Sequence, residues 1–186
     1  VMMCALSTVL FGVDIWQAFL ESRHFTRNVI LEAGSTGWHK ITSVFSVVRM
    51  WGGTVALAYT AQAVLALCVL AASVWMWRSK ADHDLKAASL IVGSLLMTPY
   101  MLDYDMVVLA PALLFLVRNS LKFDFEPYER FGLALVWFAP ILTRQAAQYL
   151  AIPVGPLAMI CLFILIVHKA IRQTSADAMV PRKIPA

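Results

Sequence analysis

The stretch MTPYMLDYDMVV, residues 97–108, decides how the chain folds, because it places two carboxylates inside an otherwise apolar run, residues 87–117. Ionisable groups are expensive inside a membrane segment and indicate a functional site. The run is also too long for one span: a single helix over it would measure about 46 Å, against a hydrocarbon core of about 30 Å. The sequence therefore predicts a break at Asp103, Tyr104 and Asp105.

The composition indicates a membrane protein. Of the 186 residues, 61% are hydrophobic and 14% are charged, whereas soluble domains are about half apolar and a quarter charged. One core cannot bury so much apolar surface, so a bilayer is the expected solvent. No basic stripe interleaved with aromatic residues points to nucleic acid. The three cysteines give neither a disulfide framework nor metal-ligand spacing; we expect no metal or cofactor, with a divalent ion left open.

The basic residues predict the topology. They gather in two loops, residues 78–86 and 118–130, and in a tail, residues 169–186. If all three face the cytoplasm, ten of the fifteen Lys and Arg lie inside, as the positive-inside rule requires. Both loops then share one side, so residues 87–117 must cross out and back as a hairpin, with the acidic residues at its outer tip.

The rest of the chain predicts an all-α, polytopic bundle of transmembrane helices. Residues 52–77 form a spanning helix with tryptophans at both ends, and two further apolar segments follow the second basic loop. The chain opens inside an apolar segment, and we expect it to be the C-terminal part of a longer protein. We expect a transmembrane domain at 1–168, containing a polar outer loop at 13–51, and a cytoplasmic tail at 169–186.

The acidic tip allows two interpretations, which are compatible with each other. The arms of the hairpin are short, so the tip lies at depth, where irregular backbone requires a polar cavity, here one open to the outside. Alternatively, Asp103 caps a helix that begins near Tyr104, and Asp105 lies in the first turn of that helix, against its dipole.

The outer polar stretch ends in an amphipathic helix. An apolar stripe (Ile41, Val44, Phe45, Val48) is opposed by a second stripe (Thr42, Ser46, Arg49) at helical spacing. Such a helix, next to a spanning helix, lies in the interface plane and forms the lip of the cavity. Lys40 and Arg49 then stand at headgroup depth, where they either hold a lipid phosphate or contact bulk phospholipid.

Four segments carry a resemblance to a known family: Trp16 with Phe19, LEAG with GWHK at 31–40, SVFSVVR at 43–49, and TPYMLDYD at 98–105. Together they resemble glycosyltransferase family 87, of the membrane-embedded GT-C class, over about residues 16–116. The resemblance implies an inverting transfer of a sugar, typically mannose, from a polyprenyl-phosphate donor to a lipid or glycan acceptor. It also implies a multi-pass protein of the bacterial inner membrane, with its active side facing outward among the membrane lipids.

The candidate substrate contacts are the residues of the tip and the lip: Tyr100, Asp103, Tyr104, Asp105, Lys40 and Arg49. In GT-C enzymes the catalytic acidic residue usually lies in the first outer loop, so we expect the base upstream of this chain and assign it to no residue. Two alternative functions stay open. Broken apolar helices with carboxylates also mark transport pathways, and a non-catalytic membrane subunit would use its charges for topology alone.

Overall fold

The computed structural model describes residues 2–179, with side chains described to residue 175. This part of the chain forms eight α-helices and three short 3-10 or π-helical segments, with no strand, so the predicted all-α class is confirmed. Three helical stretches are long and apolar enough to span a membrane: Val55–Arg78, Asp103–Phe123 and Val154–Ser175. A fourth span results if two helices that meet at 105°, Met2–Phe11 and Asp14–Glu32, count as one.

The chain divides into two compact units, the first of which covers residues 2–38 of the described part. It consists of α1 (Met2–Phe11), α2 (Asp14–Phe25) and the π-helical segment η1 (Thr26–Glu32). Gly34 and Gly37, at positive φ, end this helical stretch in a turn, a conformation that glycine adopts without steric cost. The indole N–H of Trp38 closes the turn by donating to the carbonyl of Leu31 at 3.1 Å.

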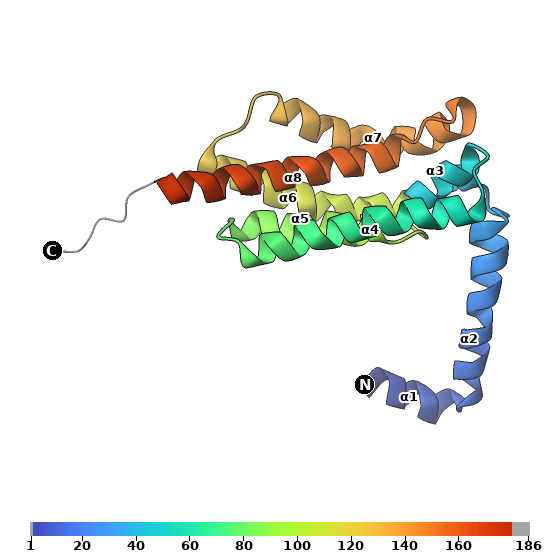
Figure 1. Cartoon of the computed structure of the whole chain (residues 1–186). Coiled ribbons are helices and arrows are strands. Elements are labelled where there is room, and N and C mark those ends of the chain that lie inside the picture. The colour runs from blue at the N-terminus through green and yellow to red at the C-terminus, as the bar shows by residue number, and fades with distance from the viewer. Residues whose placement is uncertain (1, 180–186) are drawn as a thin grey trace. The chain divides into compact units, whose positions relative to one another are not determined.

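The second unit begins at His39 and is a helix bundle. Figure 1 shows α4 (Val55–Arg78), α5 (His83–Met97) and α8 (Val154–Met179) lying side by side. The remaining elements are η2 (Trp38–Lys40), α3 (Val44–Met50), η3 (Asp103–Val108), α6 (Leu109–Phe123) and α7 (Glu129–Leu150).

The core of the bundle is built around α5, which packs against α4, α6 and α8. Leu85, Ala88 and Val92 of this helix are completely buried. Gly93 lets α4 approach closely, since a Cβ at this position would lie 3.1 Å from a methyl group of Val69. The fifteen-residue α5 is therefore covered on most sides although its sequence alone is short for a membrane span.

Residues 87–117 form a helical hairpin, as predicted. That both arms cross a membrane stays a prediction, since α5 is not among the candidate spans of the described residues. α5 and α6 pack antiparallel, and ion pairs join the two basic loops at one end of the bundle. The buried carboxylate of Asp84 contacts the ammonium of Lys122 at 2.6 Å and the guanidinium of Arg118 at 3.3 Å. Burial raises the pKa of Asp82, but the backbone N–H of Asp84 and the charge of Lys122 outweigh burial, so this pKa lies below its usual value.

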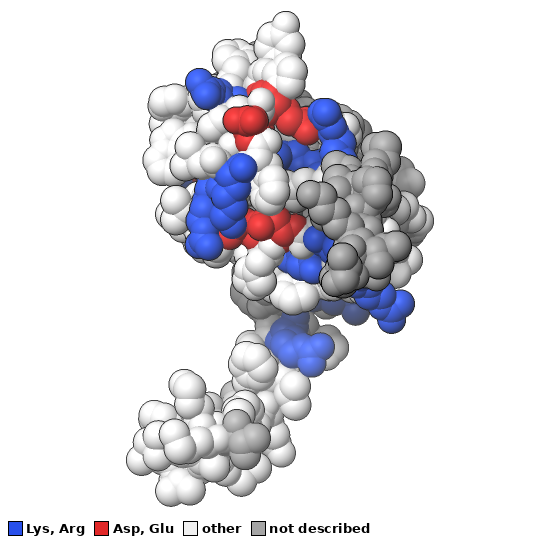
Figure 2. All heavy atoms as spheres, turned by 90° about the vertical axis from the view of Figure 1, so that its left-hand side faces the viewer, with Lys and Arg blue, Asp and Glu red and all other residues white. Residues whose placement is uncertain are grey.

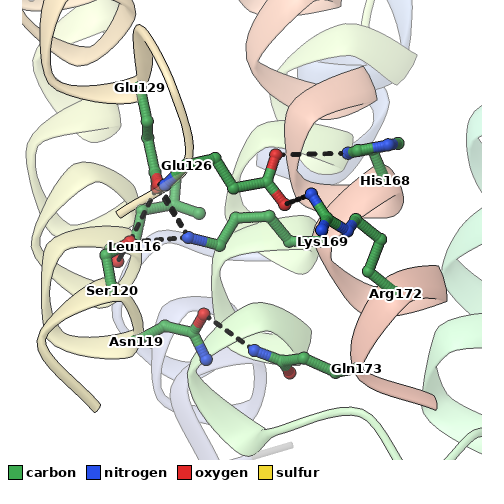
Figure 3. Close-up of polar contacts among 9 residues, drawn as sticks. All are labelled: Leu116, Asn119, Ser120, Glu126, Glu129, His168, Lys169, Arg172 and Gln173. Carbon is green, nitrogen blue, oxygen red and sulfur yellow. Dashed lines mark hydrogen bonds and ion pairs between the residues drawn. The ribbon is translucent and has the colours of Figure 1, made fainter. Parts of the chain in front are cut away.

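The same end holds a buried ionic network that reaches α8. Lys169 is 3% exposed and donates to both carboxylate oxygens of Glu129, at 2.8 and 2.9 Å, and to the hydroxyl of Ser120 at 2.7 Å. Figure 3 shows the Lys169 side chain pointing from α8 toward α6 and the start of α7. Beside it, Glu126 pairs with His168 and Arg172. In Figure 2, which faces this end, acidic groups lie between basic ones.

The network includes Lys169, the first residue of the tail expected from the sequence. Residues from 169 onward were expected to form a polar cytoplasmic tail, yet α8 continues through them to Met179. Lys169 is paired with Glu129 inside the bundle, and the cytoplasmic location of residues 169–186 stays a prediction. Arg182 and Lys183 lie outside the described residues.

The predicted amphipathic helix is shorter than expected, and its polar stripe is not exposed. Ile41 and Thr42 precede α3, which begins at Val44. Ser43 and Ser46 form a reciprocal capping box at its start. Thr42 and Ser46 are 1% and 2% exposed, and the Ser46 hydroxyl donates to the carbonyl of Ile41. The Ser46 hydroxyl can be buried because it bonds to local backbone, a possibility that a helical wheel does not consider. The Thr42 hydroxyl is buried without a hydrogen-bond partner among the described residues.

Gly155, at the start of α8, is where three segments meet. A Cβ on it would lie 2.3 Å from a Thr42 methyl and 2.8 Å from a Thr143 methyl. We predict that Gly155→Ala destabilises the bundle by about 1–3 kcal/mol, because β-branched neighbours cannot move aside easily. Gly132→Ala is the matched control: nothing lies within 4 Å of its Cβ position, so it should be neutral or stabilising by up to about 1 kcal/mol. Unfolding in detergent, followed by circular dichroism, measures both.

The Lys169–Glu129 pair supports a second stability prediction. Lys169→Met leaves a buried carboxylate without its partner and should cost about 3–5 kcal/mol, whereas the double variant Lys169→Met/Glu129→Gln should recover most of this loss. Arg172→Gln removes an exposed pair and should cost less than about 1 kcal/mol. Equal losses in the single and double variants of Lys169 would contradict the ionic explanation.

Candidate functional site

The end of the bundle opposite the basic loops contains the candidate site. Residues 98–105, here called the corner, connect α5 to η3, and a short antiparallel bridge fixes them to the chain before α3. Ile41 and Leu102 form this bridge, and the N–H of Thr42 donates to the carbonyl of Met101 at 2.6 Å. Ile41 directly follows Lys40 in the sequence and Leu102 directly precedes Asp103, so the bridge brings the two segments that carry these charges together. The bridge thus joins the segment before α3 to the corner, although the two lie about sixty positions apart in the sequence.

The two carboxylates of the corner have different roles. Asp105 accepts a hydrogen bond from the N–H of Leu102 at 2.9 Å, so it, and not Asp103, caps the first turn of η3. The helical segment begins at Asp103, one residue before the predicted start. Asp103 instead accepts from the N–H of Tyr104 at 3.1 Å and forms an ion pair with Arg144 at 2.7 Å. The cap interpretation therefore applies to Asp105.

Arg144 is a charged residue that sequence reasoning did not include among the candidates. It lies on α7, in an otherwise apolar segment, and its side chain is 47% exposed, whereas that of Asp103 is 14% exposed. An ionisable group within an apolar segment is the same signal that identified Asp103. It would have identified Arg144 as well, but only the fold reveals that the two residues are partners.

A buried glutamine bonds to the start of α3 and to the end of α5, which leads into the corner. Gln62, on α4, is 5% exposed. Its side-chain oxygen accepts from the N–H of Phe45 at 3.2 Å, and its amide nitrogen donates to the carbonyl of Leu96 at 2.9 Å. These two bonds satisfy one backbone group at the start of α3 and one near the end of α5. The amide thereby fixes both elements that carry the candidate residues.

The remaining candidates lie around this frame. Arg49 is partly buried and donates to the carbonyl of Gly53 at 2.7 Å, which closes the turn between α3 and α4. Lys40 is half-buried in η2. The side chains of Tyr100 and Tyr104 are 38% and 68% exposed. All six candidates thus belong to the same end of the bundle, but Arg49 also has a structural contact that the sequence did not predict.

An apolar groove adjoins the corner, between η3–α6 and α7, with a volume of about 520 Å³. Aliphatic and aromatic side chains line it, among them Val107, Leu109, Leu113, Val136, Trp137 and Ile141. Asp103, Tyr104 and Arg144 are the polar residues of its lining, whereas Tyr100, Asp105, Lys40 and Arg49 are not in it. Among the described residues, no three His, Cys, Asp or Glu side chains gather closely enough to hold a metal.

The comparison with known families identifies the chain. The model of glycosyltransferase family 87 matches residues 1–99, more than half of the sequence.

The chain belongs to glycosyltransferase family 87.

It is accordingly a membrane glycosyltransferase, in agreement with the resemblance seen in the sequence and with the candidate spans of the structure. No curated protein and no solved structure shows significant similarity to it. The family match includes Lys40 and Arg49 and ends at Pro99, just before the acidic residues of the corner. Roles for Tyr100, Asp103, Tyr104 and Asp105 must therefore be argued from geometry.

Proposed function

We propose that this family 87 glycosyltransferase transfers a hexose, mannose in the first instance, from a polyprenyl-phosphate donor to a lipid or glycan acceptor at the outer face of the bacterial inner membrane. One observation carries the proposal: the bridge between Ile41 and Leu102 joins the segment that leads into α3 to the acidic corner, and Asp103 of this corner lines an apolar groove together with Arg144. The corner lies at the end of the bundle away from the basic loops, which the positive-inside rule assigns to the cytoplasm.

The arrangement suits the three demands of the reaction. The isoprenoid tail of the donor needs an apolar surface, which the groove offers. The phosphate that leaves needs cations: Arg144 lines the groove, and Lys40 and Arg49 are further candidates on the segment that the bridge joins to the corner. The acceptor hydroxyl needs hydrogen-bonding groups that orient it, a role suited to the carboxylates and tyrosines of the corner. The proposal assigns these residues contacts with substrate and assigns the catalytic base to none of them.

Substitutions at Asp105 separate charge from capping. An asparagine oxygen can still accept from the N–H of Leu102, so Asp105→Asn keeps the cap and removes the charge, while Asp105→Ala removes both. We predict that Asp105→Asn lowers the transfer of labelled sugar from polyprenyl phosphate at least about tenfold, since a hydrogen bond to a charged group is worth about 1.5–3 kcal/mol. The melting temperature should fall only in Asp105→Ala.

Arg49→Ala should also reduce transfer by membranes that contain the full-length protein. The control is Arg78→Ala, which removes an exposed arginine at the other end of α4 and should leave transfer unchanged. Wild-type rates in both Asp105→Asn and Arg49→Ala would remove these residues from the site. No transfer by the wild-type protein to any lipid or glycan acceptor would refute the proposed function.

The proposed orientation is tested by thiol labelling in sealed vesicles. In a background without Cys4, Cys68 and Cys161, Tyr104→Cys should react with an impermeant maleimide only from the outer side, because Tyr104 is exposed at the corner. Lys80→Cys, in the loop after α4, should react only from the cytoplasmic side. The reverse pattern would place the corner in the cytoplasm and exclude an outward-facing site.

A further inference from the structure

The groove between η3–α6 and α7 is apolar along its length and ionic at one end. Its side chains Val107, Trp137 and Ile141 are 72%, 60% and 65% exposed, so in a bilayer they face lipid and the groove is continuous with the hydrocarbon. Pro140, inside α7, also lines it. A molecule that enters from the bilayer with an apolar chain would meet a charged pair, Asp103 with Arg144, at the outer end.

The ion pair leaves much of the guanidinium unused. Arg144 contacts Asp103 through Nε at 2.7 Å, and no other hydrogen bond or ion pair of Arg144 is present among the described residues. A guanidinium has five N–H donors and stays charged at all relevant pH values. Asp103 also accepts from the N–H of Tyr104, so it can keep a hydrogen bond if Arg144 turns toward another anion.

We propose that an isoprenyl phosphate group displaces Asp103 from Arg144 when its chain enters the groove. This proposal rests on the proposed function, since the donor and its leaving group both carry isoprenyl phosphate. Phosphate oxygens match the planar guanidinium and form bonds as strong as those of a carboxylate. A single chain fits the groove with its head at Arg144. In the free protein Asp103 therefore occupies the place of the phosphate, and binding releases its carboxylate toward the corner.

The exchange makes an unusual prediction: removing an acidic residue should improve binding. Asp103→Asn abolishes the competing charge, and we expect it to bind farnesyl phosphate severalfold more tightly than the wild-type protein does. Arg144→Gln should weaken binding at least about tenfold, a difference of about 1.4 kcal/mol. Arg130→Gln is the matched control, because Arg130 is exposed near the opposite end of α7, where it stacks on Phe125. Its affinity should equal that of wild type.

Binding is measured by tryptophan fluorescence during titration of the purified full-length protein in nanodiscs. Trp137 lines the groove, and Trp137→Phe identifies the part of the signal that comes from it. Farnesol and inorganic phosphate are separate arms, and both should bind more weakly than farnesyl phosphate, since each lacks one half of the ligand. Dioleoyl phosphatidic acid tests whether any lipid phosphate is sufficient, and we expect it to compete poorly.

Several results would overturn the exchange. These are unchanged or weaker binding in Asp103→Asn, unchanged binding in Arg144→Gln, or equal competition by phosphatidic acid. If Arg144→Gln does not fold, Arg144→Lys decides: it keeps a positive charge and should retain a preference for farnesyl phosphate over farnesol. Sugar transfer is measured separately. If the Arg144→Gln enzyme is active and binds farnesyl phosphate as tightly as wild type does, the exchange is refuted and the proposed function stands.

Discussion

The structure depends on how the backbone is satisfied where α5 ends and the chain turns back. In an apolar medium an unpaired N–H or carbonyl costs several kcal/mol, so a reversal at this place needs partners from elsewhere in the chain. The bridge between residues 41–42 and 101–102 supplies them, and Gln62 satisfies two further groups at the adjoining helix ends. The break that the carboxylates predict is therefore held by backbone and amide contacts as well as by the carboxylate of Asp105, which accepts from the N–H of Leu102.

The two ends of the bundle use charge differently. At the end with the basic loops, almost every acidic group is paired, and the buried Lys169–Glu129 contact ties α8 to α7 while Ser120 joins it from α6. Removing one partner there would leave a buried charge, so these residues mainly maintain structure. At the corner Asp103 lines a groove, and the neighbouring Tyr104 is exposed. A ligand in the groove can therefore reach a charged group at that end, as a binding site requires.

The groove lies between η3–α6 and α7, and α6 contacts α7 only sparsely whereas it packs closely against α5. At the end with the basic loops, Glu129 accepts from Ser120 and so connects the start of α7 to the end of α6. Between these contacts the two helices leave a space lined by exposed apolar side chains. Asp103 and Arg144 form an ion pair in its lining. In the proposed exchange, the apolar groove would hold the lipid chain and Arg144 would meet its head.

The sequence by itself determined the fold class, the membrane setting, the hairpin over residues 87–117 and the glycosyltransferase resemblance, because hydrophobic content, the placement of Lys and Arg, and short motifs are local properties of the chain. It identified the corner and the lip as separate segments. Only the tertiary structure decided that Ile41 pairs with Leu102, that Asp105 is the cap, that Asp103 is paired with Arg144, and that Lys169 belongs to the core. These facts depend on contacts between residues far apart in sequence, and neither hydropathy nor periodicity records which distant residues meet.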